Sequence, residues 1–360
     1  MWSGSYCGNI KNKFRKEDKM KKVPNLTFKN SLDYTIYLSN HIPKDDDEFN
    51  FIMVETCEPF PMLVTSTAIR QYRKRIVEHV SHDTKPKNCN NTYADTMRFF
   101  RATGINKGKS FDIDYGNCNY LPVTRLDLKD LREESKSNLE YIQDNIERKA
   151  IDMATVLSRN SLQFKKLLKY VLTEIMRNIP EHSNADSIWY CAQYWPSKDR
   201  VELAIIDEGI GIKNSLLSNY AYNDIIDSDR TALEYALKPG ISSKFAPGTT
   251  NNAKDEWANS GFGLYMISSL CANLEGSFTI ASGDSSLEVT KDTSSENLIY
   301  THRPCSINGT ALRIDLKPSK INDYEGVARK LLNAGENIAK TNGHAIHYAS
   351  KSTQKILEDF

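Results

Sequence analysis

The sequence lacks the long apolar runs that membrane insertion or export would require. No stretch of its 360 residues approaches the ~18 consecutive apolar residues of a membrane-spanning helix, and the N-terminus has no apolar signal-peptide core. The seven cysteines are scattered, with no CxxC pair and no histidine at metal-ligand spacing. We therefore expect reduced thiols, a cytoplasmic location and no membrane contact.

The chain also has little net charge. Lys and Arg number 47 against 46 Asp and Glu, which gives a net charge of +1 and no general attraction to nucleic acid. The exception is the beginning of the chain, where the first 30 residues hold eight Lys or Arg and only Glu17 and Asp18 as acids. We interpret residues 1–23 as a basic, disordered and solvated tail.

Residues 24–118 are predicted to form a small α/β domain. A β-prone apolar run occupies 49–54, and apolar residues at helical spacing follow at 68–80 and 93–104. This segment resembles STAS-type domains, although no motif specifies one.

Residues 119–317 contain a longer series of predicted strands and helices. A strand at 120–128 and a charged helical stretch at 131–157 precede a helix that begins near Ser161. Two β-rich runs, 187–195 and 201–206, then flank a turn that contains Pro196. Further elements are a helix at 264–274, strands at 277–281 and 311–316, and a helical C-terminal extension at 318–360.

The helix that begins near Ser161 displays Glu174, Asn178 and His182 at intervals of four residues. Successive members of such a series drift by only about 40°, so they share one side of a helix. Pro180 interrupts the series and removes one backbone N–H, which predicts a kink. The position of His182 is therefore open between a ligand contact and a structural histidine.

The second β-rich run ends directly in Asp207-Glu208-Gly209-Ile210-Gly211. An acid at the end of a buried strand, followed by glycines, lets a ligand approach the backbone closely.

Residues 213–260 are polar and have little apolar periodicity, so we expect a long mobile loop there. It contains Gly240-Ile241-Ser242-Ser243-Lys244 and is followed by Gly261-Phe262-Gly263-Leu264, which opens a helix. A glycine-rich helix start offers N–H groups and a positive dipole end to phosphate. Asn308-Gly309-Thr310 then opens a strand.

In order and spacing these four elements resemble the N box, G1 box, G2 box and terminal Gly-Thr of the GHKL ATPases, which include histidine kinases, DNA gyrase, MutL and ninety-kilodalton heat-shock chaperones. The resemblance covers residues 119–317. It implies an α+β fold, the GHKL (Bergerat) α/β sandwich with a mostly antiparallel sheet, preceded by the small α/β domain and followed by the short helical tail.

The resemblance implies roles for residues at the adenine end of an ATP site. Asp207 would accept a hydrogen bond from the exocyclic amine of adenine. Gly209 and Gly211 would make room for the base and sugar, and Thr310 would support the adenine pocket.

Other residues would serve the phosphate end. Asn178 would bind the Mg²⁺ that bridges the triphosphate. Gly261 and Gly263, with flanking amides such as that of Leu264, would hold the β- and γ-phosphates. Lys244 would neutralise γ-phosphate charge, and the 213–260 loop would close over the nucleotide. Glu174 would act as the catalytic base.

Three functions stay open. The chain is expected to be a Mg-dependent ATP-binding protein that hydrolyses ATP or uses it to gate a conformational switch on a protein partner, with a homodimer as one form of assembly. The alternatives are a protein kinase, of the anti-sigma serine type or an atypical histidine kinase, and a regulatory module without turnover. Ser81-His82-Asp83 is only a poor match to a phosphoacceptor box.

Overall fold

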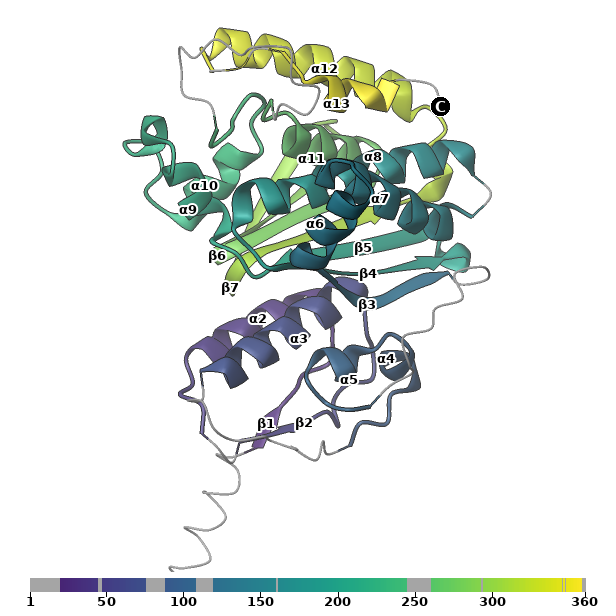
Figure 1. The fold of residues 1–360 in the computed structure, drawn as a ribbon, viewed down its shortest axis with the longest axis vertical. Coiled ribbons are helices and arrows are strands. Elements are labelled where there is room, and N and C mark those ends of the chain that lie inside the picture. Colours follow the sequence, from purple (N-terminus) through teal and green to yellow (C-terminus); the bar gives the residue numbers. More distant parts are fainter. Residues whose placement is uncertain are drawn as a thin grey trace, which may run out of the picture. The chain divides into compact units, whose positions relative to one another are not determined.

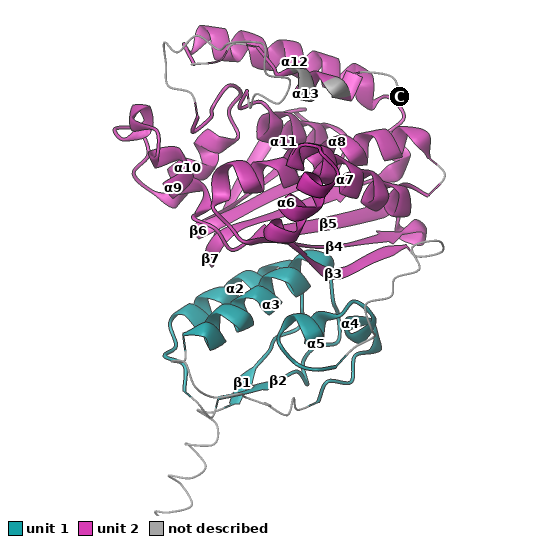
Figure 2. Cartoon of the chain, in the orientation of Figure 1, with its two compact units in different colours: residues 1–111 teal, residues 112–360 magenta. Residues whose placement is uncertain are grey.

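The computed structural model describes residues 20–44, 47–75, 88–107, 119–159, 161–244, 260–292, 294–344, 346 and 348–357. The chain divides into two compact units, residues 1–111 and 112–360 (Figure 2). Most of the basic tail and the Ser81-His82-Asp83 segment lie outside the described residues.

The first unit combines two short parallel strands with helices. The elements are β1 (Met20–Lys22), α2 (Phe28–Ser39), β2 (Glu48–Asn50), α3 (Pro59–Lys74), α4 (Thr92–Thr96) and α5 (Phe99–Ala102). The predicted strand at 49–54 is wrong beyond Asn50, because the chain turns at Ile52 and Met53. Helix α3 begins earlier than predicted, at Pro59, whose fixed φ and missing N–H suit a first helical turn.

The second unit is built on one five-stranded antiparallel sheet with strand order β3-β4-β5-β7-β6. Its strands are β3 (Tyr120–Asp127), β4 (Ser187–Trp195), β5 (Arg200–Asp207), β6 (Ser277–Lys291) and β7 (Leu298–Leu316). The predicted antiparallel sheet is confirmed. Alternate residues of β4 and β5, including Ile188, Tyr190, Leu203 and Ile205, enter the same core as the helices.

Helices cover one face of this sheet and continue into a further layer, in which α12 lies over α11 (Figure 1). The helices are α6 (Leu128–Ser137), α7 (Ile142–Ser158), α8 (Leu162–Asn178), α9 (Gly211–Leu217), α10 (Asp229–Ala236), α11 (Gly263–Asn273), α12 (Tyr324–Thr341) and α13 (Lys351–Gln354). Single turns are η2 (Ile179–Ser183), η3 (Pro196–Lys198), η4 (Tyr220–Tyr222), η5 (Pro318–Lys320) and η6 (Lys355–Leu357).

Helix α8 has a defined start and a buried stripe. The side chain of Ser161 accepts a hydrogen bond from the Phe164 N–H at 3.2 Å, which satisfies one of the unpaired donors of the first turn. Leu168, Leu172 and Ile175 are fully buried, as their helical spacing predicts. Burial of this stripe in the core that the helices share with the sheet fixes which residues the end of α8 presents.

Three expectations for this unit are wrong. The charged stretch at 131–157 is two helices, because Leu139 adopts φ +56° and ends the first. Residues 213–244 are no open loop: α9, η4, α10 and the residues between them bury Leu216, Tyr222, Ile226, Ala232 and Ala236 in a small core. Residues 245–259 of the expected loop lie outside the described residues. Strands β6 and β7 also extend well beyond the predicted 277–281 and 311–316, as a long hairpin.

Among the described residues, no helix combines the length and the apolar character that a bilayer crossing requires.

Candidate active site

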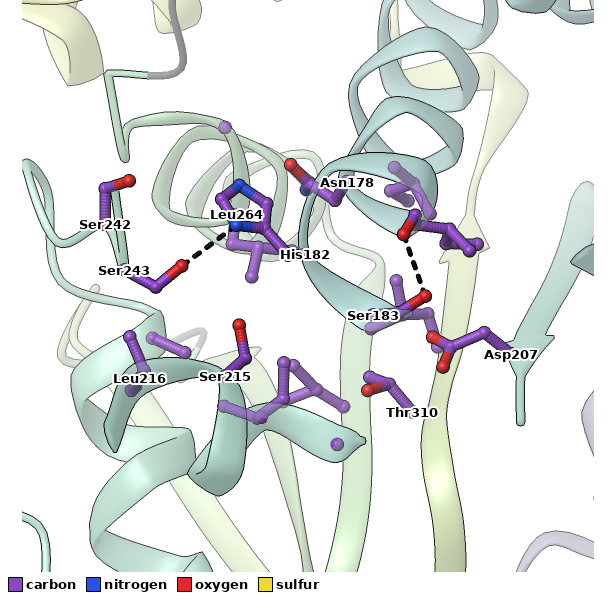
Figure 3. A pocket seen from close by; sticks show the side chains of 18 of the residues that line it. Asn178, His182, Ser183, Asp207, Ser215, Leu216, Ser242, Ser243, Leu264 and Thr310 are labelled. Atoms are coloured by element: carbon purple, nitrogen blue, oxygen red, sulfur yellow. Dashed lines mark hydrogen bonds between the residues drawn. The ribbon is translucent and has the colours of Figure 1, made fainter. Parts of the chain in front are cut away.

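A cavity opens in the second unit where the ends of α8 and β5 and an inner part of β7 meet α9 and the start of α11 (Figure 3). It encloses about 850 Å³ of empty space, including the part open to solvent. Its walls are mainly apolar and consist of Ile175, Ile179, Ile205, Ile212, Leu216, Ala236, Ile241, Leu264, Ile280 and Leu312.

Eight of the residues singled out in the sequence line this cavity. They are Asn178, His182, Asp207, Gly211, Gly261, Gly263, Leu264 and Thr310. Figure 3 shows Asp207 and Thr310 at one end, and Ser242 and Ser243 toward the other. Gly209, Glu174 and Lys244 are not part of the lining.

The end of α8 explains how both Asn178 and His182 reach the cavity. Asn178 is the last residue of α8, and the chain then continues as a single π-helical turn over Ile179–Ser183. A wider turn of this kind accommodates Pro180, which lacks the N–H of a regular helix. At the predicted kink, Pro180 lies in this widened turn, which keeps His182 at the cavity wall.

His182 is held as a neutral side chain. Its Nδ1 lies 2.9 Å from the Ser243 hydroxyl, and the two groups point toward each other in Figure 3. Burial, together with the nearby charge of Lys244, lowers the pKa of His182 to about 4. At neutral pH the imidazole therefore offers one hydrogen-bond donor and one acceptor without a charge.

Asp207 is the last residue of β5 and is only 4% exposed. Its Oδ1 accepts a hydrogen bond from the Gly209 N–H at 2.8 Å. Burial raises the pKa of Asp207 to about 6, although the N–H groups of Gly209 and Thr310 act in the opposite direction. The carboxylate is therefore ionised at neutral pH and can accept a further hydrogen bond from a ligand.

A glycine is required at position 209 by backbone packing outside the cavity lining. A Cβ at this position would lie 2.1 Å from the Ser183 carbonyl oxygen, and the next residue, Ile210, donates its N–H to that same oxygen at 2.8 Å. The chain after β5 thus packs directly on the π turn. Gly211, at φ +76°, then turns the chain into α9 and lines the cavity.

The start of α11 forms another wall. Gly261 has φ +70°, and a Cβ there would lie 2.3 Å from the Ile241 carbonyl oxygen. Gly263 and Leu264 are the first residues of α11, and the first N–H groups of an α-helix have no partner within the helix. This wall is therefore suited to an anion such as a phosphate.

Glu174 lies behind that wall. It is 8% exposed, and a Cβ at Gly263 would lie 2.7 Å from its Oε2. Its Oε1 is 3.4 Å from Nη1 of Arg177, and Nη2 of Arg177 is 3.5 Å from Glu181. Lys244 Nζ lies 3.3 Å from the other oxygen of Glu181. A chain of four alternating charges thus connects Glu174 to Lys244.

The cavity also contains the hydroxyl groups of Ser183 and Ser215, which the sequence did not single out, and those of Ser242 and Ser243. Ser242 and Ser243 lie within the Gly240 to Lys244 run, so its glycine and serine content was a usable signal. Nothing in the polar stretch around Ser215 distinguished it from its neighbours.

The cavity combines an apolar slot, a buried acceptor and a helix start, which suits a ligand with a flat amine-bearing ring and an anionic tail. Residues 164–317 match the family model described as Histidine kinase-, DNA gyrase B-, and HSP90-like ATPase. No curated protein matches the chain. Together with the antiparallel sheet under its helices, this match identifies residues 164–317 as an ATP-binding domain of the GHKL ATPase superfamily, with the GHKL α/β sandwich fold.

Proposed function

We propose that residues 112–360 bind Mg-ATP in this cavity, and that ATP binding or hydrolysis drives a conformational switch on a protein partner. The observation that carries the proposal is the buried carboxyl group of Asp207 at one end of an apolar slot that leads to a helix start. A homodimer is one form that the partner could take.

At the Asp207 end, the carboxylate would accept a hydrogen bond from the exocyclic amine of adenine. Guanine has a carbonyl oxygen in that position, and two acceptors facing each other would leave both unpaired. Thr310 pairs with Asp207 in the sheet register and lines the same end, and Gly211, which also lines the cavity, would leave room for the ring.

At the other end, the phosphates would meet the N–H groups of Gly261, Gly263 and Leu264. Asn178 offers an amide oxygen to Mg²⁺, and His182 offers a neutral donor. Among the described residues, no group of three or more His, Cys, Asp or Glu could hold a metal. A single amide ligand nevertheless fits Mg²⁺, which usually retains waters and is bound largely through substrate phosphates. When bound, the metal would neutralise phosphate charge.

Lys244 would serve the γ-phosphate only after it leaves Glu181, with which it is paired here. Its side chain is 43% exposed, so replacing Glu181 by a phosphate as its anionic partner would change the solvent exposure of Lys244 little.

A second candidate, a nucleotide-binding module without turnover, is favoured by the surroundings of Glu174. This carboxylate lies outside the cavity lining and is bonded to Arg177. To act as a base it would have to reach a water beside the γ-phosphate, past Gly263.

Titration calorimetry with Mg-ATP tests the proposal. Asp207→Asn should weaken ATP binding by roughly 10–100-fold, the effect of losing a hydrogen bond to a charged group. Asn178→Ala should weaken ATP binding more when Mg²⁺ is present than when a chelator has removed it. Asp224→Asn, at an exposed position, is the matched control and should bind like wild type. Absence of ATP binding by the folded wild-type chain would end the proposal.

A further inference from the structure

The C-terminal segment, the described part of residues 344–357, packs on the ATP-binding unit near the cavity without lining it. Its short helical turns α13 and η6 contact α8, and η6 also contacts α12. Ile346, Ala349 and Ile356 are buried in the same core as the sheet and the helices. The segment is therefore docked on the unit by a few apolar side chains.

One contact of this segment is with the chain just before the cavity wall. Nδ1 of His344 lies 2.7 Å from the carbonyl oxygen of Pro239. The next residue, Gly240, has φ +79°, and a Cβ there would lie 2.4 Å from the carbonyl oxygen of Ile346. The close approach of two backbones at this point requires a glycine.

A second contact is with the chain just before α11. The Ser350 N–H donates a hydrogen bond to the hydroxyl of Ser260 at 2.9 Å, and Ser260 is only 3% exposed. The two contacted stretches are also joined to each other, because the Gly240 N–H donates to the carbonyl oxygen of Gly261 at 3.2 Å. The C-terminal segment thus bridges two stretches that are adjacent in space and separate in sequence.

Both stretches lead directly into the cavity wall. Ile241, Ser242 and Ser243 follow Gly240, and Gly261 and Gly263 follow Ser260, and all five line the cavity. A change in the position of Gly240 or Ser260 is therefore transmitted along one or two peptide units to the surface that would hold phosphate.

We propose that the C-terminal segment is a regulatory strap for the nucleotide site. When docked, it holds the two wall stretches in the binding geometry; when it is released, nucleotide leaves faster. Segments with few buried side chains open locally at low free-energy cost, so a protein partner that binds the strap could control nucleotide exchange. This inference rests on the proposed function, because it assigns regulation to the same site.

Two glycine variants test the strap. Gly240→Ala places a methyl group against Ile346, whereas Gly343→Ala carries the same positive-φ penalty with nothing within 4 Å of the new Cβ. In Gly240→Ala, the release of a fluorescent ATP analogue should accelerate about tenfold or more, as expected from overpacking a close contact. Ser260→Ala, which only removes the hydroxyl that accepts from Ser350, should act in the same direction more weakly.

Hydrogen exchange supplies the readout that a purely local clash would not change. Gly240→Ala should speed amide exchange in 348–357 as well as in 260–264, and Mg-ATP should slow exchange in 348–357 of the wild type, because coupling between sites is reciprocal. If wild type binds ATP but Gly240→Ala and Gly343→Ala match in release and in exchange at 348–357, the strap is overturned. If wild type binds no ATP, the failure lies in the proposed function.

Discussion

Asp207 illustrates how one buried side chain links function to stability. The carboxylate is almost inaccessible, and burial raises its pKa to about 6 from an ordinary value of 3.8. A buried acceptor that awaits a ligand hydrogen bond therefore costs the free protein stability whenever it is ionised.

The pH dependence of unfolding should reveal this cost. Because the folded-state pKa exceeds the unfolded value, folded Asp207 binds more protons between pH 3.8 and about 6, and its contribution to stability falls as pH rises through that window. Asp207→Asn removes this pH-dependent cost. The unfolding free energy of the variant minus that of wild type should therefore be roughly 2 kcal/mol larger at pH 7.5 than at pH 4.5. Denaturant titration at the two pH values measures it. The comparison between pH values cancels any fixed cost of the Asn side chain, and a pH-independent difference would contradict the expectation.

The surroundings of Glu174 are compatible with two roles, that of a catalytic base and that of a structural ion-pair partner of Arg177. Its contact with Gly263 brings it close to the wall that would hold phosphate, while Arg177 keeps its carboxylate paired.

Glu174→Gln separates the two roles. If Glu174 activates the nucleophile, the variant should retain near wild-type ATP affinity while turnover falls by roughly 10²–10⁴-fold, the usual contribution of a general base. Phosphate release and calorimetry on the same samples measure both quantities, with Glu133→Gln on the exposed side of α6 as control. Equal turnover in wild type and Glu174→Gln would assign the carboxylate a structural role and favour the binding module.

At the scale of elements, the cavity depends on the contact between the π turn after α8 and the loop after β5. Ile210 donates to the Ser183 carbonyl oxygen, and Gly209 has no side chain to keep the two backbones apart. Asn178 and His182 on one side and Asp207 on the other are brought together by this contact.

Gly209→Ala should therefore affect both stability and binding. Its Cβ would meet a backbone carbonyl at 2.1 Å, so the turn and the loop must separate, at a cost of about 1–3 kcal/mol in unfolding free energy. ATP affinity should fall as well, because the adenine and metal ends of the cavity would shift relative to each other. Gly326→Ala in α12 is the control, since the three atoms nearest to its Cβ belong to the side chain of Asp323 and alanine favours a helix. Thermal unfolding and calorimetry would compare the two variants. Equal effects of Gly209→Ala and Gly326→Ala would show that the contact between the π turn and the loop after β5 is unimportant for stability and binding.

At the scale of the whole molecule, the chain has two compact units, and the cavity and the strap belong to the second. A ligand that binds only folded protein stabilises it by about 2.7 kcal/mol when present at a hundred times its dissociation constant.

Mg-ATP at that concentration should therefore slow hydrogen exchange of the most protected amides in residues 119–357 by up to about a hundredfold. Exchange in residues 20–107 should stay unchanged if the first unit is energetically independent. Mass-spectrometric exchange with ATP, and with GTP as a control for base recognition, distinguishes these regions. Equal slowing in both units would show instead that nucleotide binding is coupled across the whole chain, as a conformational switch requires.

Local sequence patterns predicted the helix that carries Asn178, the acid at the end of β5 and the glycine-rich start of α11. Each of these follows from local periodicity or from residues whose backbone preferences act over a few positions, whereas the mostly antiparallel sheet was implied by the resemblance to GHKL ATPases. Two helix boundaries were predicted wrongly, because each depends on a single residue. Leu139 separates α6 from α7, and Pro59 begins α3.

Local sequence patterns do not predict which side chains meet, because these contacts form only when the chain folds. The pairing of Lys244 with Glu181, the position of Glu174 behind Gly263 and the docking of 344–357 beside Gly240 and Ser260 all join residues far apart in sequence. The helices α9 and α10 escaped prediction for the same reason: their apolar residues are few, and the core that stabilises them forms only when distant segments pack together.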